Sequence, residues 1–223
     1  MIEKSKPIIT PLVAVDTVIL TVHNNKLCVL LAKIKFGPFK GMHGIPGGRV
    51  KIDETLENAA KRELLEKTGL TDVYLEQLYS FGSIKRDPSV RIVSVSYFAL
   101  VNSNEVELKS TGKYAEITWC PVHKLETLAY DHNTIIKYAL FRLKNKIRYT
   151  NIMYSLLPNK FTLSDLQKMY ELTLEKKLDK RNFRKKIMSS HLIKESGIEE
   201  GVSHRPSKLY SFKSNHPVYV EIF

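Results

Sequence analysis

Residues 48–70 read GRVKIDETLENAAKRELLEKTGL, and this stretch decides the fold of the first half of the chain. Between Glu54 and Thr68 the apolar residues recur at steps of three and four, which is the spacing of one face of an α-helix. Asp53 is placed to cap the start of this helix, and Gly69 is placed to end it. The stretch therefore predicts a helix with one apolar face.

Strand-like segments lie on both sides of this helix. Before it, β-branched and aliphatic residues at about 13–22 and 27–32 predict a hairpin, and a glycine-rich loop at 37–48 follows. After it, further strands are expected at Tyr74–Phe81, Arg91–Val101 and Glu116–Cys120. Because strands and helix alternate, the pattern predicts an α/β or α+β domain.

The second half of the chain has a different order of elements. A helix from Thr134 to about Arg148 is interpreted as a connector, so we divide the chain into domains at 1–148 and 149–223. A helix at about 164–175, a second at about 180–189 and a hairpin wing around His204–Lys208 follow. This order is typical of a small winged helix-turn-helix domain.

The positive charge is concentrated in the second half. The chain has a net charge of +12, and residues 134–223 carry 18 lysines and arginines against 8 aspartates and glutamates, or +10 of that total. A basic region of this size favours a polyanionic partner, which could be DNA, RNA or an anionic lipid surface.

Cysteine usage and hydropathy exclude two classes of protein. Cys28 and Cys120 each lie in an apolar setting, which favours buried free thiols over a disulfide framework or a metal site. No apolar run approaches the roughly 20 residues that a membrane span needs, and the first strand is not followed by a signal-peptide cleavage site. We therefore expect a cytoplasmic protein without a membrane partner.

Residues 48–70 resemble the Nudix box, in which a glycine, a glutamate and an Arg-Glu pair stand at these spacings. Ile45-Pro46-Gly47-Gly48 and Trp119-Cys120-Pro121 resemble the flanking segments of the same family. The resemblance implies a Nudix fold, with a mixed sheet sandwiched by helices. It also implies that Arg62 orients a glutamate, that Glu63 and Glu66 hold divalent cations on a diphosphate, and that Glu54 supports them.

Lys67 departs from the family pattern, which has an acidic residue there. Lys67 lies four residues after Glu63 on the same helix face, so its ammonium can pair with Glu63 and occupy the place of a metal. We therefore expect a degenerate box with weak or absent metal binding at Glu63 and Glu66. No cofactor is required on this interpretation, although Mg²⁺ remains an option if some hydrolase activity survives. Without a metal, both glutamates could simply be solvated.

Such a pocket can bind a ligand without cutting it. The backbone at Gly47 and Gly48 can approach phosphates closely, and Arg86 can donate charge-assisted hydrogen bonds to them. The alternative for Arg86 is an ordinary ion pair with Asp87 within the turn.

Basic residues in the second half are candidates for contacts with DNA. Guanidinium and amide side chains match base edges in the major groove, and ammonium groups match phosphates. The candidates are Lys180, Arg181, Asn182, Arg184, Lys185 and Lys186 on the second helix, and Arg205 and Lys208 on the wing.

The segments SLLPNKFTLSDLQKMYE (155–171), LDKRNFRKKI (178–187) and YLEQLYSFGSIKRDPSVRIVSVSYFALV (74–101) resemble the Nudix-related transcriptional regulators. The resemblance implies a homodimeric repressor of genes of NAD metabolism or sugar use that binds a palindromic DNA operator. The effector would be ADP-ribose, a related NAD-derived nucleotide or a sugar such as arabinose. The alternatives are a Nudix hydrolase acting on ADP-ribose or a related nucleoside diphosphate, and an RNA-binding Nudix protein.

Overall fold

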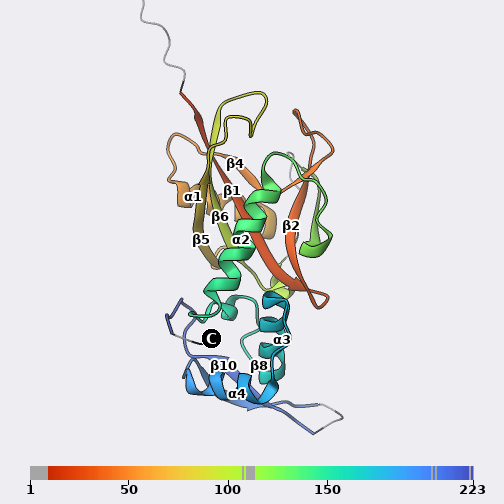
Figure 1. Cartoon of the computed structure of the whole chain (residues 1–223), viewed down its shortest axis with the longest axis vertical. Helices are drawn as coiled ribbons and strands as arrows, with labels where there is room; N and C mark the ends of the chain where they lie inside the picture. Colours follow the sequence, from red (N-terminus) through yellow and green to blue (C-terminus); the bar gives the residue numbers. More distant parts are fainter. Residues whose placement is uncertain are drawn as a thin grey trace, which may run out of the picture.

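The computed structural model describes residues 10–106, 108, 114–201, 203, 205–220 and 222. The chain forms two parts stacked along one long axis, a larger upper part and a smaller lower part (Figure 1). Among the described residues the upper part contains a seven-stranded sheet and the lower part a three-stranded sheet. His204, in the predicted wing, lies outside the described residues.

Among the described residues, seven strands form one mixed sheet in the upper part. It is mixed because β1 pairs in parallel with β6 but antiparallel with β2 and β4. The strands are β1 (Leu12–His23), β2 (Lys26–Ile34), β3 (His43–Gly44), β4 (Gly47–Arg49), β5 (Tyr74–Phe81), β6 (Ile92–Leu100) and β7 (Tyr114–Pro121). The predicted hairpin is confirmed, and its turn contains Asn24 and Asn25 with positive φ angles of 48° and 59°.

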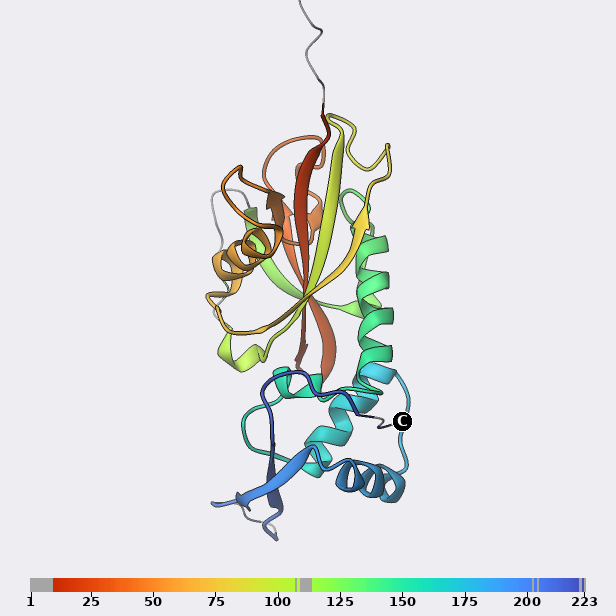
Figure 2. The same cartoon turned by 90° about the vertical axis from the view of Figure 1, so that its left-hand side faces the viewer.

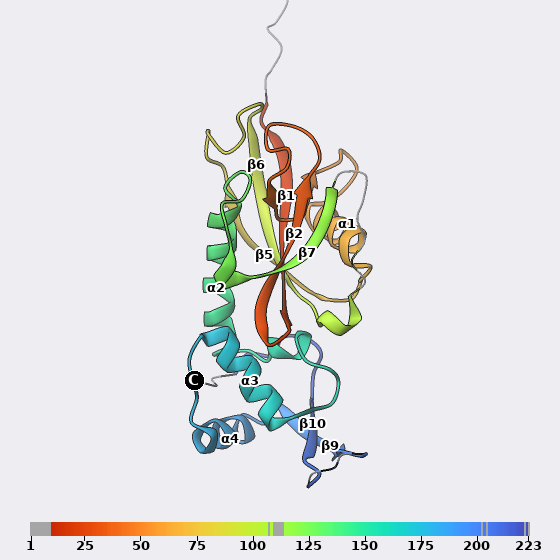
Figure 3. The same cartoon turned by 90° about the vertical axis from the view of Figure 1, so that its right-hand side faces the viewer.

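Two helices cover opposite faces of this sheet, α1 (Leu56–Thr68) and α2 (His132–Lys146), as Figures 2 and 3 show. Gly69 ends α1 in the left-handed conformation, as predicted. The predicted cap at Asp53 is wrong, because the helix starts two residues later than expected. Thr55 is the cap instead, and its side chain accepts a hydrogen bond from the backbone N–H of Asn58.

The lower part has the predicted winged-helix order. It contains β8 (Phe161–Thr162), α3 (Leu163–Leu174), α4 (Lys180–Ser189), β9 (Ile193–Ile198) and β10 (Lys208–Phe212). Thr162 and Asp165 form a reciprocal capping box at the start of α3. Short 3₁₀ helices lie in the connections: η1 (Ser103–Glu105), η2 (Val122–Lys124) and η3 (Ile152–Ser155).

Helix α2 joins the two parts. Its buried residues, among them Ile135, Ile136 and Leu143, belong to one apolar cluster that continues into the lower part through Ile152 and Leu166. Residues 214–220 and 222 lie near the end of α2, where the amides of Val220 and Ile222 donate to backbone carbonyls at 149 and 148. The predicted boundary at 148/149 thus falls within continuous packing, and it stays a prediction.

Both thiols are free: Cys28 is buried, and Cys120 is only partly buried. None of the helices in the described part of the chain is long and apolar enough to cross a membrane.

Candidate functional site

A buried lysine, Lys67, lies against the two glutamates Glu63 and Glu66 on α1. The side chain of Lys67 is only 1% exposed, and its Nζ lies 3.0 Å from Oε2 of Glu66 and 3.8 Å from Oε2 of Glu63. The ammonium also lies 5.2 Å from the centre of the Tyr114 ring. The predicted pairing of Lys67 with Glu63 is therefore present, and Lys67 and Arg62 together balance the charges of Glu63 and Glu66.

Arg62 holds the other side of the cluster. Its Nη1 donates to Oε1 of Glu63 at 2.9 Å, and its Nε and Nη2 donate to the two carboxylate oxygens of Glu54 at 3.1 and 2.8 Å. The hydrogen bonds from Arg62 lower the pKa of Glu54 to about 2. Arg62 therefore has the geometry of an orienting arginine, while its catalytic role, with that of Glu63 and Glu66, stays a prediction.

The arrangement does not fit a divalent cation at Glu63 and Glu66. Magnesium demands near-octahedral oxygen ligands, which an adjacent buried ammonium would oppose by repulsion. In the described residues, no three His, Cys, Asp or Glu side chains are grouped so that they could hold a metal ion. Lys67 supplies the positive charge that a metal would otherwise bring.

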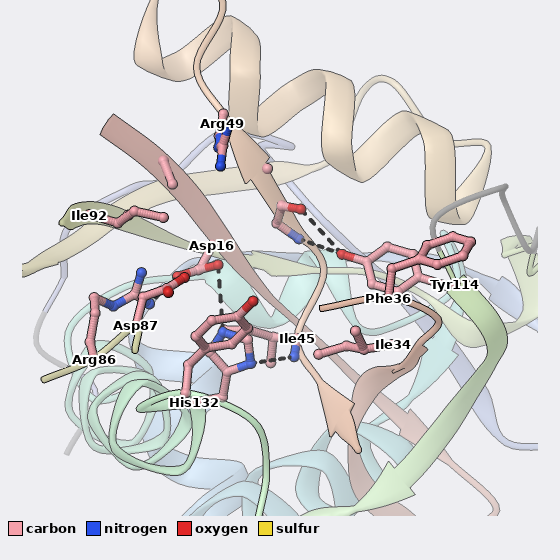
Figure 4. A pocket seen from close by; sticks show the side chains of 14 residues that line it. Asp16, Ile34, Phe36, Ile45, Arg49, Arg86, Asp87, Ile92, Tyr114 and His132 are labelled. Carbon is pink, nitrogen blue, oxygen red and sulfur yellow. Dashed lines mark hydrogen bonds and ion pairs between the residues drawn. The ribbon is translucent and has the colours of Figure 1, made fainter. Parts of the chain in front are cut away.

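A cavity of about 290 Å³ lies beside β4 and the start of α2 (Figure 4). Ile34, Phe36 and Tyr114 lie on one side of it, and the charged residues Asp16 and Arg86 lie on the other. Such a division suits a ligand that has an aromatic or apolar part and a charged or polyhydroxyl part.

Arg86 lines this cavity, as expected for a ligand-binding residue, and its binding of phosphate stays a prediction; its protein partners are not the one expected from the sequence. Its Nη2 donates to Asp16 at 2.7 Å and to Asp131 at 2.8 Å, and its Nε donates to both oxygens of Asp131 at 3.1 Å. An ion pair with Asp87 was the alternative and is wrong, because the carboxylate of Asp87 accepts the amides of Ser89 and Val90 in its own turn. Arg86 thus ties β1 to the residue that precedes α2.

Asp16 is the centre of this network. Burial alone would raise its pKa, but His132, Arg86 and a hydrogen bond from Ser94 lower it further than burial raises it, so the pKa lies well below its ordinary value. His132 Nδ1 accepts the amide of Ile45 at 3.1 Å, and its Nε2 lies 3.7 Å from Asp16. Asp16 is therefore ionised at neutral pH.

Gly47 and Gly48 also line the cavity, as predicted for ligand binding, yet the structure gives them a packing role as well. A Cβ atom at Gly47 would lie 2.3 Å from Oδ1 of Asp16, and one at Gly48 would lie 2.0 Å from Oε1 of Glu63. Larger residues would therefore displace the two carboxylates. A role in approaching phosphates stays a prediction.

Several cavity residues were not among the sequence candidates: Asp16, Phe36, Arg49, Tyr114 and His132. Two of them had a signal in the sequence, since Asp16 is a charged residue inside an otherwise apolar strand and Arg49 directly follows the candidate Gly48. The others are brought to the cavity from distant segments, so no local pattern marks them.

The helix α4 presents its basic side chains outward. Phe183 and Ile187 are its buried residues. Within the described part of the chain, four exposed cationic side chains of α4 form no ion pair: Lys180, Arg181, Arg184 and Lys185. Asn182 is exposed too, and its backbone N–H donates to the capping carboxylate of Asp179 at 2.8 Å.

A groove of about 310 Å³ runs between α3, α4 and the wing, and four of the predicted DNA-binding residues line it: Lys180, Arg184, Arg205 and Lys208. Lys208 pairs with Glu195 across the wing at 2.8 Å, with both side chains largely exposed. Arg181, Asn182 and Lys185 do not line the groove and lie on other sides of α4. The structure thus brings together basic residues from two elements, whereas their contacts with DNA stay predictions.

Comparison with known families matches both parts of the chain. Residues 10–141 match the NUDIX domain, and residues 153–212 match the NrtR DNA-binding winged helix domain.

Individual proteins show the same likeness. The chain is 38% identical over 207 residues, 91% of its length and 82% of the relative's, to the ADPR responsive transcriptional repressor NtrR of Acinetobacter baylyi. Shewanella oneidensis NrtR in complex with a 27mer DNA is similar in structure, with a TM-score of 0.81 and 33% identity, covering 90% of this chain and 93% of that one. The Nudix domain of S. oneidensis NrtR in complex with ADP ribose has a TM-score of 0.56 and 34% identity, covering 63% of this chain and 94% of that domain.

The predicted fold and family resemblance are therefore confirmed over nearly the whole chain. With its Lys67-closed Nudix box and its basic winged helix, this chain belongs to the NrtR family, whose members join a Nudix domain to a DNA-binding winged helix.

Proposed function

We propose that this protein is a transcriptional repressor that binds duplex operator DNA and releases it when ADP-ribose binds the Nudix domain. The observation that carries the proposal is the position of the two sites. The cavity lies at the first residues of α2, and the basic groove lies in the winged helix beyond the last residues of the same helix. Helix α2 runs from the sheet toward the lower part (Figure 1). The A. baylyi relative is an ADPR responsive transcriptional repressor, which supports the proposal.

Contacts with DNA are assigned by side-chain chemistry. Arg181, Asn182, Arg184 and Lys185 contact bases and phosphates in the major groove, because they project from the exposed surface of α4. Lys180, together with Arg205 and Lys208 of the wing, contacts the phosphate backbone. A palindromic operator would be bound by a homodimer, with half-sites about one helical turn apart, and we place the protein in the cytoplasm.

The effector is assigned to the cavity of the Nudix domain. ADP-ribose has an aromatic base, a diphosphate and a terminal sugar, which match the apolar side, the arginines and the carboxylates of the cavity. The S. oneidensis Nudix domain in complex with ADP ribose supports this choice over arabinose. Hydrolysis is disfavoured because Lys67 stands against the glutamates that would hold a metal.

The test is a fluorescence-anisotropy titration of the full chain against duplex DNA from upstream of its own gene, with ADP-ribose, NAD or arabinose, each with and without Mg²⁺. We expect sequence-selective binding that ADP-ribose weakens. Binding that is indifferent to sequence, or selective binding that no ligand weakens, contradicts the proposal. Magnesium-dependent release of AMP from ADP-ribose by the unaltered protein would favour the hydrolase instead.

A further inference from the structure

We propose that the ion pair between Arg86 and Asp131 is the link through which an anionic effector acts on DNA binding. In this scheme the effector's diphosphate draws Arg86 away from Asp131, the start of α2 is released, and α2 carries the change to the winged helix. The inference rests on the proposed function and names the contact that regulates it.

The position of Asp131 makes it a suitable contact. It precedes the first residue of α2, where an aspartate would ordinarily cap the helix, yet its side chain makes no capping hydrogen bond. Both of its carboxylate oxygens accept from Arg86 instead. The start of α2 is therefore held by Arg86, a cavity-lining side chain from the loop between β5 and β6.

Arg86 is equipped to bind an anion from the cavity. Its side chain is only 4% exposed and lines the cavity, and its Nε and Nη2 are used by the two aspartates. Its Nη1 donates to none of the described residues, so two N–H donors of the planar guanidinium are left for a ligand. Arginine binds phosphate in a bidentate manner, which makes a diphosphate a direct competitor of Asp131.

Charge favours this competition. Asp16 and Asp87 line the cavity together with Arg86 and Arg49, and Asp131 is paired with Arg86. A diphosphate that enters is repelled by the carboxylates unless the guanidinium turns toward it. Asp16 keeps further partners in His132 and Ser94 when Arg86 moves, whereas the carboxylate of Asp131 makes no other hydrogen bond or ion pair with the described residues.

The far end of α2 is fastened to the winged-helix part. Asn151, just beyond α2, binds the backbone of the returning tail through three hydrogen bonds, to Ser214, His216 and Val218. Lys144 on α2 pairs with Glu175 at the end of α3 at 2.8 Å. A helix of 15 residues is about 22 Å long, so a tilt at its first turn displaces elements at that distance.

The second half of α2 is held to the sheet by ion pairs of its own. Glu76 on the edge strand β5 forms ion pairs with Arg142, at 3.1 Å, and with Lys146, both on the second half of α2. These contacts do not involve the cavity, and they lie at the end of α2 that is fastened to the winged helix through Lys144. A shift of the released first turn about this end therefore rotates the winged helix.

The experiment compares the natural chain with Asp131→Asn, which keeps the shape of the side chain but loses its charge. DNA affinity is measured by anisotropy with and without saturating ADP-ribose, and ADP-ribose affinity is measured by calorimetry. For the natural chain we expect ADP-ribose to weaken DNA binding by roughly 5- to 150-fold, the usual range of coupling between two sites. For Asp131→Asn we expect the ratio of the DNA affinity without ADP-ribose to that with ADP-ribose to fall toward one. DNA binding should already be weak without the ligand, and ADP-ribose binding should be undiminished.

Glu57→Gln is the matched control, because Glu57 forms an exposed ion pair with Lys61 on α1, away from α2. It should keep the full response. If Asp131→Asn does not fold, the inference is tested by hydrogen–deuterium exchange of the natural chain. ADP-ribose should speed exchange of the backbone amides in the first turns of α2, because their contact with Arg86 is released.

The outcomes separate this inference from the proposed function. If the natural chain binds its operator but does not respond to ADP-ribose, both are overturned. If the natural chain responds and Asp131→Asn responds to the same degree, or exchange in the first turns of α2 is unchanged, only the role of the Arg86–Asp131 pair is overturned.

Discussion

Replacing Lys67 by methionine tests whether its ammonium stands in for a metal ion. Methionine has a similar length and keeps the packing, so Lys67→Met removes mainly the charge. The change leaves Glu63, whose side chain is 5% exposed, without its cation at Oε2, and this oxygen has no hydrogen-bond partner in the described structure.

The magnitude follows from burial. Removing one partner of a buried ion pair costs about 3–5 kcal/mol. Because Oε1 of Glu63 keeps its hydrogen bond from Arg62 and Glu66 is 43% exposed, we expect the lower end of this range. A loss of about 3 kcal/mol lowers the midpoint of thermal unfolding by about 6–12 °C in a chain of this size.

Thermal unfolding is followed with and without Mg²⁺ for the natural chain, Lys67→Met and Lys67→Glu. Magnesium should leave the natural chain unchanged, and it should raise the midpoint of Lys67→Glu, because a ligand that binds only the folded state stabilises it. Lys67→Glu is also the variant in which magnesium-dependent hydrolysis of ADP-ribose should appear.

Two results would refute this reasoning. A Lys67→Met midpoint equal to that of the natural chain would mean that Glu63 does not depend on the ammonium. Stabilisation of the natural chain by Mg²⁺ would mean that Lys67 does not exclude the metal. The double variant with Glu63→Gln checks the pairing, since its destabilisation should be smaller than the sum of the two single effects.

Three further predictions concern other parts of the chain. Lys180→Ala should reduce the slope of log affinity for DNA against log salt by about 0.9, the value for one lost phosphate contact; an unchanged slope, measured by anisotropy over a salt series, would contradict the assignment of Lys180 to the phosphate backbone. The lowered pKa of Asp16 means that its ion pairs contribute stability above its unfolded pKa, about 3.9, and that this is lost as pH falls through the lower folded pKa. Asp16→Asn should remove this contribution from acid unfolding, which is followed by the fluorescence of the single tryptophan, Trp119. If the variant and the natural chain give identical acid-unfolding curves, the ion pairs of Asp16 do not contribute this stability. Burial raises the pKa of Cys28 and of Cys120, so both thiols should react slowly with a thiol reagent until the chain unfolds; rapid labelling of Cys28 at neutral pH would show that it is accessible.

Local patterns in the sequence were sufficient for most of the secondary structure. The helix that became α1 was predicted because its apolar spacing, its final glycine and its flanking turns all lie within about 20 residues. The cap was misplaced because Asp53 and Thr55 are both good caps, and only the backbone path decides which side chain reaches the amide of Asn58. The second helix of the winged domain, Lys180–Ser189, was predicted with its correct bounds because Asp179 is the one cap before it.

Helical periodicity also predicted those parts of the two sites that lie on a single helix. Lys67 and Glu63 are four residues apart on one helix, so helical periodicity alone placed their charges together. The basic residues of α4 could be identified in the same way, since a helix with two buried residues must expose the rest.

The cavity and its ion network could not be predicted in this way. Arg86 lies 70 residues from Asp16 and 45 from Asp131 in the chain, and the sequence pattern offered only its neighbour Asp87 as a partner. Their meeting depends on the parallel pairing of β1 with β6 and on the placement of α2 against that sheet. Periodicity within one element determines which side chains share a face of that element, whereas contacts between elements form only when the buried faces pack, and so only the tertiary structure places Arg86 between two carboxylates.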